Sequence, residues 1–111
     1  MKVDFNVVFF ADERSMRKTV WEDKDDYLSK HRLEATKHNP RKLRIKAENS
    51  KIRGSINVKW DRGTSTLRCD GISNSPNTPY ELIGMFIGYL LEFSNSRDSR
   101  IRVVNIFPEI I

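Results

Sequence analysis

Cysteine is nearly absent from this chain, and long hydrophobic runs are missing altogether. The one cysteine, Cys69, excludes an internal disulfide framework and a zinc site built from several thiolates. The most apolar stretch, residues 82–91, is too short to span a bilayer, which takes about 20 apolar residues. The first residues include Asp4 and lack a small-residue cleavage site, so they do not predict a signal peptide. We therefore expect a soluble, cytoplasmic protein with no membrane partner.

Motifs for cofactor binding and nucleophilic catalysis are also missing. The five glycines stand at positions 54, 63, 71, 84 and 88, and none of them forms a phosphate-binding loop. No Gly-x-Ser-x-Gly elbow and no cysteine-centred catalytic signature occurs. The sequence therefore predicts no cofactor, no metal site and no enzyme.

The length and the apolar segments predict one globular domain over residues 1–111. A chain of 111 residues matches the commonest domain size. Strand-like and helix-like segments follow one another in the order β-α-β-β-β-α-β. We expect an α+β fold with a mixed, mostly antiparallel sheet and two helices.

The first segment, residues 3–10, predicts a strand because β-branched and aromatic residues dominate it. From Val7 onward both of its faces are apolar, which predicts a place near the sheet centre with both faces covered. Residues 11–20 predict a connection, and a short edge strand over residues 17–22 is the alternative.

The next segment predicts a surface helix from Asp25, its N-cap, to about Lys37. Asn39-Pro40 ends this helix, because the residue before proline is pushed out of helical space. Its inner stripe consists of Tyr27, Leu28, His31 and Ala35.

Three segments with period-two alternation predict an antiparallel meander over residues 43–69. Two-residue turns at 49–50 and 62–63 bring matching faces together. The cross-strand pairs expected from these turns are Ala47 with Ile52, Lys46 with Arg53, Ile56 with Cys69 and Val58 with Leu67.

A capping sequence at residues 78–81 predicts the second helix. It supplies a threonine N-cap, a proline at the first helical position and a glutamate that completes a capping box. The helix extends to about Phe93 and is apolar around most of its circumference. Within it, Gly84 and Gly88 are expected to let the helix lie close to the sheet. A last strand is expected over residues 100–107.

Basic residues concentrate in the meander and carry the main functional hypothesis. Residues 37–59 contain eight Lys or Arg against one acid, Glu48. The alternation places six bases on the face opposite the core, and these are the predicted partner-binding residues: Lys42, Arg44, Lys46, Arg53, Lys59 and Arg68. The pair of Lys46 and Arg53 costs stability unless an anion lies between them. An acidic protein surface or a phosphate backbone would supply that anion.

The two histidines support a different hypothesis. On the expected helix His31, Glu34 and His38 share one edge, a spacing that also occurs by chance. Metal ligation needs further ligands that the sequence does not supply, so no metal is predicted there. A metal-free nuclease, with a histidine and Glu34 as acid and base, is kept as an alternative.

Three functional hypotheses result. The first is a small non-enzymatic inhibitor, of the immunity-protein or phage-antagonist kind, that docks on an acidic protein partner. The second is a nucleic-acid-binding domain that contacts a duplex backbone without sequence specificity, because the basic face offers no aromatic side chains for base stacking. The third is the nuclease. A homodimer is a further expectation, either through the apolar residues 107–111 or through the helix face of Gly84 and Gly88.

Overall fold

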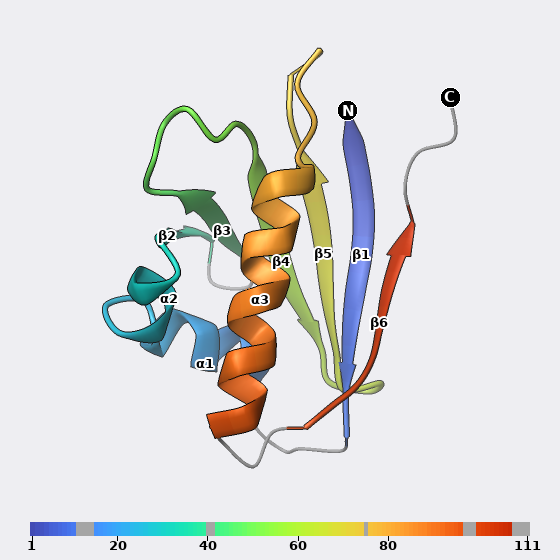
Figure 1. Cartoon of the computed structure of the whole chain (residues 1–111). Coiled ribbons are helices and arrows are strands. Elements are labelled where there is room, and N and C mark those ends of the chain that lie inside the picture. Colours follow the sequence, from blue (N-terminus) through green and yellow to red (C-terminus); the bar gives the residue numbers. More distant parts are fainter. Residues whose placement is uncertain (11–14, 40–41, 75, 97–99, 108–111) are drawn as a thin grey trace.

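In the part of the chain that the structure describes, six strands form one antiparallel sheet, and three helices cover one of its two faces (Figure 1). The computed structural model describes residues 1–10, 15–39, 42–74, 76–96 and 100–107. The strands are β1 (Lys2–Phe9), β2 (Leu33–Asn39), β3 (Lys42–Ala47), β4 (Ser55–Asp61), β5 (Thr66–Ile72) and β6 (Ile101–Phe107), in the spatial order β2-β3-β4-β5-β1-β6. The helices are α1 (Met16–Glu22), α2 (Tyr27–Lys30) and α3 (Tyr80–Ser96). The predicted α+β class is confirmed, whereas the sheet has one strand more than expected and no parallel pair among the described strands.

Strand β1 confirms the prediction for residues 3–10, but the helices cover only one of its faces. The buried side chains on that face are Val3, Phe5, Val7 and Phe9. The expected burial of both faces is wrong, and so is the central position, because β1 lies one strand from the edge, between β5 and β6.

The expected helix from Asp25 to Lys37 is replaced by the single turn α2 and the strand β2. Arg32 adopts a φ of 59° and so turns the chain from the helix into the strand. Leu33 is buried, Glu34 is exposed, and the strand pairs with β3. Leucine, glutamate, alanine and lysine favour helices in isolation, and pairing with β3 overrides that preference.

Residues 16–22 form helix α1 where a connection or an edge strand was expected. Ser15 caps the helix, because its Oγ accepts a hydrogen bond from the backbone N–H of Lys18 at 3.3 Å. Met16 and Val20 lie one turn apart and are both buried in the core. Apolar residues four positions apart indicate a helix, but the charged residues around them make this pattern hard to recognise in the sequence.

The hairpins β3-β4 and β4-β5 keep the predicted faces but shift each register by two residues. Ile45 pairs with Ile56, and Val58 pairs with Cys69. Both loops are longer than the two residues expected. A shift of two residues leaves every side chain on its predicted face. Cys69 is therefore buried as expected, and burial raises the pKa of its thiol.

Helix α3 confirms the second predicted helix and packs on the core through Leu82, Phe86, Tyr89, Leu90 and Phe93. Gly84 and Gly88 do not bring it close to the sheet, because a Cβ added to either would meet no atom within 4 Å. The close approach occurs at Gly71 of β5, where a Cβ would lie 2.7 Å from Cδ1 of Ile83. Within the described ranges, no helix is both long and apolar enough to cross a membrane.

Strand β6 confirms the prediction for residues 100–107 and forms one edge of the sheet, beside β1. The register shifts after Val8, which makes Arg102 the extra residue of a bulge. The apolar tail expected to pack beyond Phe107 lies outside the described residues.

Candidate functional site

The sheet face opposite the helices carries most of the predicted binding residues, and we call it the open face. All three described helices lie on the other side of the sheet (Figure 1). Five of the six predicted bases project from the open face, because each alternates along its strand with a buried neighbour: Lys42, Arg44, Lys46, Lys59 and Arg68.

The sixth base, Arg53, lies in the loop before β4 rather than on a strand. The predicted cross-strand pair of Lys46 and Arg53 is therefore wrong, but both side chains line one hollow of about 290 Å³. The other residues around this hollow are Gly54, Ser55, Ile72, Ser73, Asn74 and Asn77. None of the described residues that line it is acidic, so an anionic group entering the hollow meets two positive charges and polar side chains.

Gly54 shapes this hollow by letting the loop lie against β5. Its φ is +105°, a conformation that side-chain-bearing residues rarely adopt. A Cβ at this position would lie 2.8 Å from the backbone oxygen of Ile72. The loop that carries Arg53 is therefore fixed at the rim of the hollow.

A like-charge pair occupies the middle of the open face, where Lys59 lies directly opposite Arg68. Such a pair costs about 0.2–1 kcal/mol. Arg68 finds partial compensation, because its Nη2 donates to Oδ2 of Asp61 at 3.3 Å. Burial by itself would raise the pKa of Asp61, but hydrogen bonds from Thr64 and Arg68 outweigh that effect and lower the pKa.

Two acids that the sequence did not single out lie beside that pair. Asp4 on β1 is directly opposite Asp70 on β5. Burial and a hydrogen bond with Asp4 raise the pKa of Asp70, while the charges of Lys2 and Lys59 act in the opposite direction. The two acids line a second hollow, of about 340 Å³, with Phe5, Asn6, Lys59, Arg68, Cys69 and Phe107. The alternation of β1 and β5 predicts that both acids face outward, but not that the two strands are neighbours.

Apolar side chains border the open face on the β6 side. Phe107 lies opposite Asp4, and Val103 lies opposite Val8, so both project on this face. Phe107 is more than half exposed, and Val103 and Ile72, at the end of β5, are exposed to a smaller extent. Clusters of charged and apolar groups on one surface are typical of protein interfaces. No family profile, curated protein or solved structure matches this chain.

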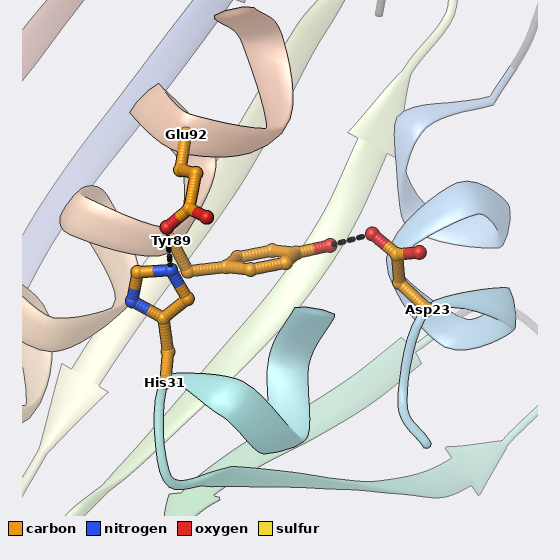
Figure 2. A network of polar contacts seen from close by, with 4 residues as sticks. All are labelled: Asp23, His31, Tyr89 and Glu92. Carbon is orange, nitrogen blue, oxygen red and sulfur yellow. Dashed lines mark hydrogen bonds and ion pairs between the residues drawn. The ribbon is translucent and has the colours of Figure 1, made fainter. Parts of the chain in front are cut away.

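A second polar cluster lies on the helix side of the sheet (Figure 2). The hydroxyl of Tyr89 donates to the buried carboxylate of Asp23 at 3.0 Å. His31 contacts Glu92 through Nε2, and its ring lies edge-on to Tyr89 with centroids 5.9 Å apart. These contacts tie the segment that contains α1 and α2 to α3.

The expected grouping of His31, Glu34 and His38 on one helix edge is wrong, because residues 33–39 form a strand. Glu34 projects from the open face, whereas His31 packs against Tyr89 on the helix side. The side chain of His38 lies outside the described part of the structure. Among the described side chains, no group of three or more His, Cys, Asp or Glu residues is arranged to hold a metal ion.

Proposed function

We propose that this chain is a small cytoplasmic binding protein of the inhibitor type, which docks on an acidic protein surface through its open face. The observation that carries the proposal is the hollow lined by the bases Lys46 and Arg53, which has no acid among its described lining residues. On the β2 side of Lys46, Glu34 lies directly opposite it and compensates its charge in part. A carboxylate of the partner can accept hydrogen bonds from both side chains there. Hydrogen bonds of this kind, between charged groups, are about twice as strong as neutral ones.

The pair of Lys59 and Arg68 supplies a second contact point for the same partner. The two charges repel one another in the free protein, and Asp61 compensates for Arg68 in part. An acidic group of the partner placed over the pair would relieve the remaining repulsion. Charges grouped in this way also accelerate the encounter with an acidic surface.

The open face favours a protein over a nucleic acid as the partner. A phosphate backbone that crosses the sheet from β3 toward β6 would meet the acids Asp4 and Asp70 after passing the bases. Beyond them it would meet the apolar side chains of Val103 and Phe107, which offer nothing to a phosphate. A protein surface can match acidic, basic and apolar areas in turn.

A nucleic-acid-binding domain is the second candidate function. It is favoured by the five bases that β3, β4 and β5 place on neighbouring positions of one face. We do not propose a nuclease with His31 and Glu34 as acid and base, because these two side chains project on opposite sides of the sheet.

The test is a comparison of two charge-reversal variants in affinity capture from the native host, with chemical crosslinking and identification of the bound protein. The variant Lys46→Glu/Arg53→Glu, called the hollow variant, reverses the charge of the two bases that line the hollow. The control Lys18→Glu/Lys30→Glu makes the same change in net charge on α1 and α2, away from the open face. We expect the wild type and the control to capture the same acidic protein and the hollow variant to lose it.

A partner that the hollow variant retains and the control loses would refute the proposal. The second candidate is tested by a salt titration against duplex DNA, duplex RNA and single-stranded RNA. Tight binding that weakens steeply with salt would favour the nucleic-acid function, because each phosphate contact releases a counterion.

A further inference from the structure

The sheet has two edges, and one of them presents a run of five residues without a charged side chain. An unpaired edge presents a row of backbone N–H and C=O groups to any other strand. Strand β2, at one edge, carries Glu34 and Lys37, and the Lys37 ammonium lies 4.8 Å from the centre of the Trp21 ring. Strand β6, at the other edge, has no charged residue from Val103 to Phe107.

Strand β6 also exposes large apolar side chains on both of its faces. Ile106 lies opposite Phe5 on the helix side and is 50% exposed. Val103 and Phe107 project on the open face and are 41% and 56% exposed. A partner lying on one face of the sheet would cover only part of this set. A strand added beside β6 would cover both faces and pair the backbone groups on the edge of β6 that no other described strand pairs.

We infer that this added strand is β6 of a second copy of the chain, paired antiparallel about a two-fold axis through Asn105. This register sets Val103 opposite Phe107 and Val104 opposite Ile106, so that residues of the same face meet. The first is a pair of an aromatic and a β-branched side chain, which stabilises antiparallel strands. The two-fold symmetry makes the two backbones complementary. If the backbone N–H and C=O of one Asn105 point toward the other copy, those of the second Asn105 point back in the same way.

Charge explains why two copies meet here rather than elsewhere. Each copy carries a net charge of +5, so contacts between the basic open faces are repulsive. The pairing of residues 103–107 brings no charged side chain of one copy opposite one of the other. The bulge at Arg102 ends the regular strand and leaves that charge beyond the paired segment.

Asn105 supports the register that the apolar pairs on either side of it set. Its side chain donates to Oδ1 of Asn6 on β1 at 2.9 Å and projects on the open face. In the dimer the two Asn105 side chains lie opposite each other and extend this line of amides across the axis. A shift of the register would place these amides against apolar side chains, which costs their hydrogen bonds.

The two-fold axis is perpendicular to the sheet, so the helices of both copies lie on one side and both open faces lie on the other. The dimer therefore presents two identical binding surfaces in one plane. This arrangement adds to the proposed function, but its test requires no partner.

The first experiment measures the mass of the full chain by sedimentation velocity over a range of concentrations. We expect a species of twice 13.0 kDa at high concentration. The variant Ile106→Lys should be monomeric, because it places a charge of each copy in the pairing. The control Leu91→Lys makes a similar change at an exposed position of α3, 53% exposed, and should remain dimeric. Circular dichroism melts verify that both variants fold.

The second experiment tests the register with engineered cysteines and copper phenanthroline as the oxidant. Asn105→Cys should form a disulfide between copies, because Cα atoms directly opposite in an antiparallel pair lie about 4.5–5.5 Å apart. Val103→Cys should not, because its counterpart in the other copy is four positions away. The native Cys69 is buried and serves as an internal control. A monomer at every concentration, a dimer that survives Ile106→Lys, or equal crosslinking at both positions would overturn the inference.

Discussion

Asp70, which lies opposite Asp4, makes a contribution to stability that depends on pH in a direction opposite to that of most carboxylates. Burial and the hydrogen bond with Asp4 raise the pKa of Asp70 in the folded state, above an unfolded value of about 3.9. The folded protein therefore binds a proton more tightly than the unfolded chain. The contribution of this proton to stability is complete below pH of about 3.9 and is lost as the pH rises through the folded-state pKa.

The variant Asp70→Asn should consequently stabilise the protein at pH 7. It removes a like-charge cross-strand pair that costs about 0.2–1 kcal/mol, while its amide can still donate to Asp4. Since Asp70 is only partly buried and Lys59 partly compensates it, we expect about 0.5 kcal/mol, or a rise in Tm of about 2–4 °C.

The assay is urea denaturation followed by circular dichroism at pH 7 and at steps down to pH 3. The gain in the free energy of unfolding should shrink as Asp70 of the wild type becomes protonated. Asp25→Asn is the matched control, because the Asp25 side chain is 89% exposed, and it should change the free energy of unfolding little. If Asp70→Asn is less stable than the wild type at pH 7, attraction to Lys2 and Lys59 exceeds the repulsion from Asp4 and the reasoning fails.

Two further predictions concern the packing of α3. Gly84→Ala should raise the free energy of unfolding by about 0.5–1 kcal/mol, because its Cβ meets open space, whereas Gly71→Ala should lower it by about 1–3 kcal/mol through the clash with Ile83. Urea denaturation of the two variants should give changes of opposite sign in the free energy of unfolding. A lower free energy of unfolding for Gly84→Ala would contradict the exposed position of this helix face. Tyr89→Phe should cost about 1–3 kcal/mol, because the buried carboxylate of Asp23 loses a donor. Hydrogen exchange should then increase first in α1 and α2, and unchanged protection there would show that the contact does not anchor them.

The parts of the fold that the sequence predicts correctly are those with a strong local pattern. Strand β1 has alternating apolar residues, and α3 has a capping sequence followed by an apolar helix, so neither depends on distant contacts. Strand β2 is built from residues that favour helices, and only pairing with β3 makes it a strand. A single sequence contains no signal for that pairing.

The candidate site can likewise be predicted from the sequence only in part. The period of two along β3, β4 and β5 suffices to place five bases on one face, even though both registers are shifted by two residues. The hollow at Lys46 and Arg53 depends on the longer loop, and the pair of Asp4 and Asp70 depends on β1 lying beside β5. Loop length and strand order are tertiary properties, so these two features emerge only from the structure.

Because all described helices lie on one side of the sheet, the residues that stabilise the fold are mostly different from those that form the open face. The core lies between the sheet and the helices, so most open-face residues contribute little to folding; Asn57 and Thr66, which are buried between their neighbours, are exceptions. Substitutions at the remaining positions can therefore change the charge and shape of the open face while the fold stays intact. The surface and the core of this domain can change independently of one another.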